Sequence, residues 1–160
     1  MVMQEKIKDP LFYEENRVAA HSDHKYFVNE AEWIQNVQSM KRSLDGIWKF
    51  HYARNMEEAP AYFYKSETDC RNWEDIRVPA HIQLEGYDKP QYVNVQDPWD
   101  GHEVIEPGEI PTRFNPTASY VKYFTVPAQF EGKRTFVSFQ GVESGFALWC
   151  NGSYIGYIQT

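Results

Sequence analysis

Short runs of alternating apolar and polar residues dominate the chain after Ser43. The runs "GIWKFHY" (46–52), "YVKYFTV" (120–126) and "RTFVSFQ" (134–140) are rich in β-branched and aromatic residues and are flanked by Gly, Pro or Asn. This pattern is typical of an antiparallel sandwich or jelly roll. We therefore predict an all-β fold in which each run forms a strand.

The last fifteen residues, "FALWCNGSYIGYIQT" (146–160), predict a hairpin. Asn151-Gly152 is the strongest two-residue hairpin signal, and aromatic-rich runs flank it on both sides. The second run continues to Thr160 without a polar tail. We therefore expect the chain to be a piece of a longer protein.

The segment before Ser43 follows a different pattern. Residues 1–28 are polar and irregular, with Pro10 as a breaker, and indicate an arm that lies on another surface. Within 29–40, Asn29 is a candidate N-cap with Glu32 three residues later, and Ala31, Ile34, Val37 and Met40 recur at helical spacing. We predict one short helix there.

A long proline-rich linker separates the early strand from the late ones. It runs from Pro79 to Pro116 and carries six of the nine prolines of the chain. Irregular stretches of this length in a small domain are usually functional loops or surfaces for a partner.

Composition narrows the functional classes. The chain has 160 residues, of which 42% are hydrophobic and 16% aromatic, which suffices for one domain with a sizeable core. A net charge of -7 with scattered basic residues argues against nucleic-acid binding. No apolar run approaches the length of a membrane span and no signal sequence is visible, so we expect a cytoplasmic protein with two reduced thiols, Cys70 and Cys150.

The sequence motifs identify no catalytic centre. The acidic loop "DPWDGHEVIEPGE" (97–109) gathers carboxylates around His102, but its spacing matches no known metal or acid/base pattern, and a solvated loop is favoured. Strand positions favour core roles for Trp48 and Trp149. For Trp99, inside the linker, packing in the core and stacking on a sugar are equally favoured.

Four motifs, in order, resemble the start of the large bacterial β-galactosidases of glycoside hydrolase family 2. They are "RSLDGIWKF" (42–50), "VPAHIQLEGYDKPQYVNVQDP" (78–98), "NPTASY" (115–120) and "GVESGFALWCNGSYIGY" (141–157), and "NRVAAH" (16–21) is similar to the arm of those enzymes. The resemblance implies a galactose-binding-like jelly roll over 29–160, incomplete at its end and preceded by the arm 1–28. It favours a β-galactosidase over a β-glucuronidase or β-mannosidase.

The resemblance also implies that the chain itself is not catalytic. In this family two catalytic glutamates lie in a TIM barrel that would follow Thr160, so a fragment ending there is expected to be inactive. Full-length members often use Mg and Na, but we expect no cofactor in this chain. The expected partners are the β-galactoside substrate and other domains or subunits of the same enzyme.

One short stretch matches residues that line the family's substrate pocket. Asn94 corresponds to an asparagine that helps to hold galactose hydroxyls, and Val95 follows at the same wall; Trp99 is a weaker candidate. An amide offers both donors and an acceptor to neighbouring hydroxyls without adding charge. The alternative role of Asn94 is to cap its own turn.

Two other functions remain open from the sequence. The chain could be an autonomous carbohydrate-binding module, or the same domain of a β-glucuronidase-like enzyme. If the chain is a truncated piece, open strand edges at "RTFVSFQ" or "YIGYI" predict that it associates with itself.

Overall fold

The computed structural model describes residues 5–22, 24–90, 94 and 98–159. Within them, the strands form two antiparallel three-stranded sheets, and helix is limited to residues 5–6 of the arm, α2 (Glu30–Gln35) and the 3₁₀ turn η1 (Ala128–Phe130). The predicted all-β class is confirmed. The strands are β1 (Glu14–Glu15), β2 (Gly46–Ala53), β3 (Glu74–Val78), β4 (Thr117–Val121), β5 (Gly145–Cys150) and β6 (Ser153–Gln159).

The first sheet has the order β3-β2-β4, with β2 bonded on both sides. Phe50, at the middle of β2, is fully buried. The ring of Tyr120 on β4 packs 4.9 Å from the Phe50 ring, and that of Tyr87 from the linker lies 4.6 Å away. Burying a phenylalanine contributes about 1.5–3 kcal/mol to folding, so this cluster is the centre of the sheet's stability.

The second sheet, β1-β6-β5, contains the predicted hairpin. Cys150 pairs with Ser153 across the turn, and Asn151 and Gly152 have φ angles of 47° and 81°. Positive φ at both central residues is the geometry that Asn-Gly adopts in a two-residue hairpin. The predicted hairpin is confirmed.

Aromatic side chains from the segment after β2 connect the two sheets. Tyr64 stacks on Trp149 of β5 with ring centroids 4.7 Å apart, while Phe63 contacts both Trp149 and Trp73, the residue before β3. Trp48 is also half-buried, and its indole N–H donates to the carbonyl of Leu44 at 2.8 Å. Trp48 and Trp149 therefore serve packing, as the sequence predicted.

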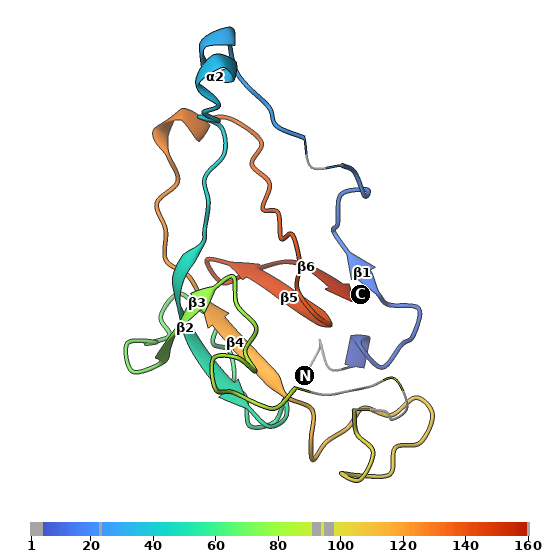
Figure 1. The fold of residues 1–160 in the computed structure, drawn as a ribbon. Coiled ribbons are helices and arrows are strands. Elements are labelled where there is room, and N and C mark those ends of the chain that lie inside the picture. The colour runs from blue at the N-terminus through green and yellow to red at the C-terminus, as the bar shows by residue number, and fades with distance from the viewer. Residues whose placement is uncertain (1–4, 23, 91–93, 95–97, 160) are drawn as a thin grey trace.

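The arm lies on the closing hairpin of its own chain (Figure 1). Glu14 and Glu15 pair with Ile158 and Tyr157 of β6. The Glu15 carboxylate accepts hydrogen bonds from Lys6 at 2.9 and 3.0 Å and from the Tyr154 hydroxyl at 2.7 Å. These bonds, from Lys6 first, hold the pKa of Glu15 below its usual value. The arm contains a strand that local pattern did not predict.

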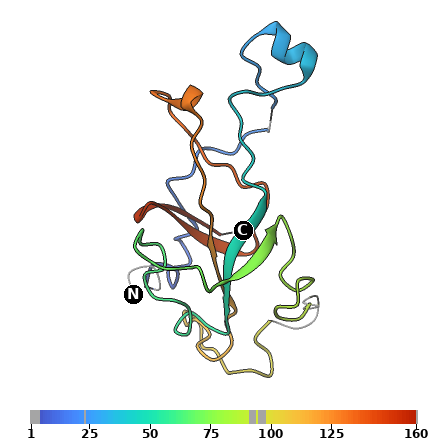
Figure 2. The same cartoon turned by 90° about the vertical axis from the view of Figure 1, so that its left-hand side faces the viewer.

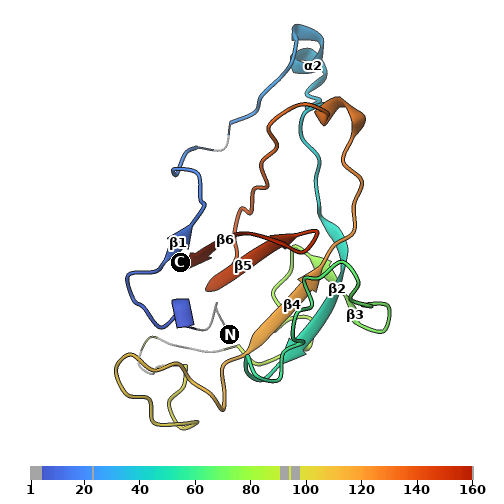
Figure 3. The ribbon, with the colours of Figure 1, turned by 180° about the vertical axis from the view of Figure 1, so that it is seen from behind.

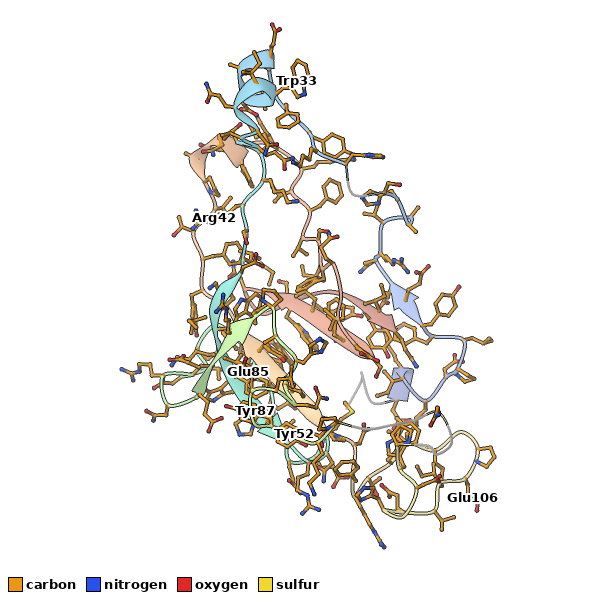
Figure 4. All side chains as sticks on the ribbon, in the orientation of Figure 1. Trp33, Arg42, Tyr52, Glu85, Tyr87 and Glu106 are labelled. Atoms are coloured by element: carbon orange, nitrogen blue, oxygen red, sulfur yellow. The ribbon has the colours of Figure 1, made fainter. Side chains whose placement is uncertain are left out.

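The helix α2 is shorter than the predicted range 29–40. Asn29 is its N-cap, as predicted, and its side chain accepts from the Glu32 amide at 3.0 Å. Asn36 adopts a left-handed conformation with φ 52°, which ends the helix after six residues. Trp33, which Figure 4 shows at the far end of the molecule from the sheets, is 64% exposed.

Two strand predictions need correction, and a second strand, besides β1, was missed. Strand β4 ends at Val121, so residues 122–126 are not a strand. Residues 134–140 have no regular structure, and no strand of the described residues is hydrogen-bonded to them. The missed strand, β3, reads "EDIRV" and is held by its pairing with β2.

The long segments between α2 and the sheets form a projection (Figures 2 and 3). The side chain of Gln129 in η1 donates to the Ser39 carbonyl at 3.1 Å and so links the two sides of the projection. No helix within the described residues is long and apolar enough to cross a membrane. Cys70 and Cys150 are both free thiols, as predicted.

The close approach of the arm to β6 depends on Gly156. A Cβ atom there would lie 2.5 Å from the Glu15 carbonyl oxygen, which is backbone and cannot simply turn away. We expect Gly156→Ala to push the arm off β6 and cost about 1–3 kcal/mol, the usual range for overpacking. Chemical denaturation and amide exchange at Gln159, whose N–H donates to the Tyr13 carbonyl, will measure this.

Gly141→Ala is the matched control, because nothing lies within 4 Å of its Cβ position and its φ is not positive. If Gly156→Ala and Gly141→Ala have equal stability and equal amide exchange at Gln159, the contact between the arm and β6 does not depend on Gly156.

Candidate functional site

The structure places only part of the predicted site. Asn94 is exposed at a bend within the linker, and Val95 lies outside the described residues. Trp99 is half-buried, and its carbonyl accepts the His102 amide at 2.9 Å, which closes a turn. Within the described part of the chain, no hydrogen bond or ring contact joins Asn94 to Trp99.

The side chain of Tyr87 anchors the linker before Asn94. A turn precedes it, in which the Tyr87 amide donates to the Ile82 carbonyl at 3.0 Å. The Tyr87 ring packs on Phe50, and its centroid lies 6.2 Å from that of the Tyr52 ring. Figure 4 labels Tyr87 and Tyr52 at the first sheet. Its hydroxyl donates to the Glu74 carboxylate, which raises the pKa of Tyr87 to about 12. This end of the linker is therefore tied to both β2 and β3.

The carboxylate of Glu103 anchors the linker after Asn94. One oxygen accepts the amides of Arg113 at 2.9 Å and Phe114 at 3.3 Å, and the other accepts the Thr112 hydroxyl at 3.3 Å. The following residue, Asn115, donates its amide to the Arg54 carbonyl just beyond β2, at 2.8 Å. The acidic loop is thus closed by its own carboxylate and fixed to the first sheet.

Two opposing effects set the pKa of Glu103. Desolvation is the largest single influence and would raise it. The hydrogen bonds from the 112–114 segment together outweigh desolvation and lower the pKa below its usual value. Glu103 is therefore charged at neutral pH and acts as an acceptor.

The end of the acidic loop lies beside a pocket that the arm also lines. Gly108, Glu109 and Ile110 line one pocket together with arm residues, among them Lys8 and Tyr13, and with Gln159 of β6. His102 stacks on Phe114 at 4.1 Å, so its ring serves packing. Among the described residues, no group of three or more His, Cys, Asp or Glu side chains is placed to hold a metal ion.

This geometry can display a polar group to a ligand. Asn94 offers an exposed amide on a linker whose two ends are fixed. A retaining glycosidase needs two carboxyl groups about 5 Å apart across the scissile bond, one of them with a raised pKa. Among the described carboxylates whose pKa is shifted, Glu15, Glu32, Asp69 and Glu103, every shift is downward.

Sequence reasoning missed both anchors. Tyr87 lies in the linker, which local pattern assigns to neither sheet, and Glu103 belongs to the acidic loop that was predicted to be solvated. Their roles depend on partners 13 and 10 residues away in the sequence, Glu74 and Arg113. No local spacing rule marks such pairs.

Comparison with known proteins gives a consistent result. Residues 41–160 match the family described as glycosyl hydrolases family 2, sugar binding domain. The chain is 50% identical over 153 residues to a β-galactosidase of Halalkalibacterium halodurans and 44% identical over 161 residues to one of Streptococcus thermophilus. A β-galactosidase large subunit of Latilactobacillus sakei is 34% identical over 162 residues.

These alignments cover 94%, 98% and 94% of this chain, but only 15%, 16% and 26% of the respective relatives. The chain therefore spans about a sixth of the length of the first two. The match over residues 41–160, together with the all-β fold, shows that this chain belongs to the sugar-binding domains of glycosyl hydrolase family 2.

Proposed function

We propose that this domain is the non-catalytic part of a retaining β-galactosidase, in which it forms one wall of the pocket for terminal β-galactosides. The observation that carries the proposal is the 50% identity, over 94% of this chain, to a protein named β-galactosidase. In this proposal the catalytic carboxyl groups belong to other parts of the enzyme. The domain contributes a substrate contact and a surface for assembly.

Asn94 is the residue proposed to contact the sugar. Its exposure leaves the amide free to meet a ligand. The anchors at Tyr87 and Glu103 restrict the span that carries it, which lowers the entropy lost when a ligand is bound. Val95 is proposed for the same wall, with Trp99 as the weaker candidate.

The proposed partners are other domains or subunits of the same enzyme. The name "large subunit" among the relatives supports a multi-part assembly in those proteins. Any Mg or Na of the full-length enzyme is proposed to bind outside this chain. A cytoplasmic location is proposed on the two free thiols, which persist most readily in a reducing compartment.

The isolated chain is expected not to hydrolyse a chromogenic β-galactoside, because the proposal assigns both catalytic carboxyl groups to other domains. Activity should be assayed across the fractions of a gel-filtration run. Turnover that follows the 160-residue peak would contradict the proposal.

In the complete enzyme, Asn94→Ala should weaken transition-state binding by about 1–3 kcal/mol, the cost of leaving a polar partner unsatisfied. This corresponds to a loss of roughly 5- to 150-fold in kcat/KM. The loss should be smaller for a deoxy analogue that lacks the contacted hydroxyl. Asn115→Ala is the control, because it removes a side-chain amide from the same linker but outside the proposed pocket.

Kinetics on both substrates should accompany a melting curve. An unchanged ratio of kcat/KM between the two substrates, with a lowered Tm, would assign Asn94 to turn capping instead.

The Glu103 anchor predicts acid sensitivity of the linker. Because the folded-state pKa lies below that of the unfolded chain, its contribution is fully present above the unfolded value and is lost as the pH falls through the folded value. The amide NMR signals of Arg113 and Phe114 should therefore shift together in that acidic range. Glu103→Gln should give the shifted signals already at neutral pH.

Glu106→Gln, a change in the same loop at an exposed position, is the control and should leave both signals in place. Identical titrations in the two variants would show that Glu103 does not hold the loop.

A further inference from the structure

The turn between β5 and β6 carries a chemically reactive dipeptide. Asn151 is followed by Gly152, and no other asparagine of the chain precedes a glycine. Asparagine is one of the less stable side chains in proteins, and a glycine after it has no side chain to hinder its own amide nitrogen. Asn151 is exposed at the tip of the hairpin, where water reaches it. The sequence and the exposure together mark this asparagine as the most reactive in the chain.

The reaction available to this dipeptide is deamidation. Hydroxide removes the proton of the Gly152 amide, and the nitrogen then bonds to Cγ of the Asn151 side chain. The bond from Cγ to the side-chain nitrogen breaks, and that nitrogen takes a proton from water and leaves as ammonia. Water opens the resulting cyclic imide at either carbonyl carbon, which leaves aspartate or isoaspartate in place of the asparagine.

The folded turn holds the two reacting atoms apart. Asn151 has a φ angle of 47° and Gly152 one of 81°, and Cys150 pairs with Ser153 across them. In left-handed backbone of this kind ψ is about +47°, which places the next amide nitrogen on the opposite side of the Cα–C bond from Cβ. The Gly152 nitrogen can therefore reach Cγ of Asn151 only after the turn has opened.

The segment after β2 packs against the turn from one side. Tyr64 stacks on Trp149 of β5, and its carbonyl oxygen lies 3.9 Å from the position that a Cβ atom would take at Gly152. The Trp149 ring also contacts the Tyr154 ring of β6, with centroids 5.7 Å apart. These contacts oppose the separation of the two strands next to the turn.

The arm holds β6 just beyond the turn. The Tyr154 hydroxyl donates to the Glu15 carboxylate at 2.7 Å, and Lys6 donates to the same carboxylate at 3.0 Å. The Asn16 side chain donates to the Ile155 carbonyl at 2.9 Å. Because β6 loses these bonds when the arm leaves, opening of the turn costs less free energy in a chain whose arm is released.

We propose that Asn151 is a deamidation site that the folded turn protects and that the arm controls through β6. This inference does not rest on the proposed substrate contact. Deamidation is irreversible, so every opening that leads to reaction changes the turn permanently. Isoaspartate adds an extra carbon atom to the backbone of a turn that needs positive φ at both central residues, so it should disrupt the pairing of Cys150 with Ser153.

The test follows the reaction in the 160-residue chain by peptide mass spectrometry at neutral and mildly alkaline pH. The hairpin peptide should gain the mass difference between a hydroxyl and an amino group, at a rate that rises with pH because the attacking nitrogen must lose a proton. The native chain should react about tenfold or more slowly than the chain in urea, where the turn is open. Asn36 is the internal control. It is also exposed, with φ 52°, but the branched side chain of Val37 hinders the attacking nitrogen.

Glu15→Ala tests the control by the arm. It removes the carboxylate that accepts from Lys6 and Tyr154, so the turn should open more often and deamidation should accelerate about two- to fivefold. Glu14→Ala is the matched control, because Glu14 lies in the same strand but its carboxylate accepts from Arg17 within the arm. This control should react at the wild-type rate. Circular dichroism should be unchanged in both variants, which separates release of the arm from general unfolding.

Asn151→Gly tests the effect of the reaction on the hairpin. Glycine permits the same positive φ but has no side-chain amide to lose. Amide exchange in β6 should become faster as the wild-type chain ages and should stay constant in the variant.

Several results would overturn the proposal. If Asn151 stays intact in urea, or reacts no faster there than Asn36, it is not a deamidation site. Equal rates in the native chain and in urea would show that the folded turn gives no protection. If Glu15→Ala and Glu14→Ala react at the same rate, the arm does not control the turn. Equal ageing of the wild-type chain and Asn151→Gly would show that the reaction leaves the hairpin unchanged.

Discussion

The packing of Tyr87 and Tyr120 around Phe50 is the interaction on which most of the structure depends. Phe50 lies on the one strand of its sheet that has a neighbour on each side, so its position is fixed by two ladders. Tyr120 comes from one of those neighbours and Tyr87 from the linker. A change at Phe50 would therefore disturb the sheet and the loop that carries Asn94 at the same time.

Features set by neighbouring residues could be predicted from the sequence, and those set by distant partners could not. The Asn151-Gly152 turn and the Asn29 cap each depend on a few adjacent residues, and both were found. The two-residue pairing of Glu14–Glu15 requires β6, more than a hundred residues later, and the absence of a side chain at Gly156. No periodicity within the arm signals such a contact.

The strand predicted at 134–140 failed for a related reason. Alternating apolar residues and β-branched residues indicate that a segment can form a strand beside a neighbour. The strand forms only if its backbone groups are hydrogen-bonded to that neighbour. Prediction of the candidate site from the sequence is limited in the same way. Asn94 came from resemblance to a family, while its physical supports, Tyr87 and Glu103, became visible only when the linker was seen in contact with β2 and with itself.

The contact between Glu15 and Tyr154 joins residues 139 positions apart and so has a consequence for synthesis on the ribosome. The arm is made before the strand on which it lies. At typical translation rates it would wait about 7–28 s before β6 becomes available. Throughout that interval Phe12 and Tyr13 remain without the hairpin, which makes the nascent arm an accessible target for chaperones until the final residues of β6 emerge.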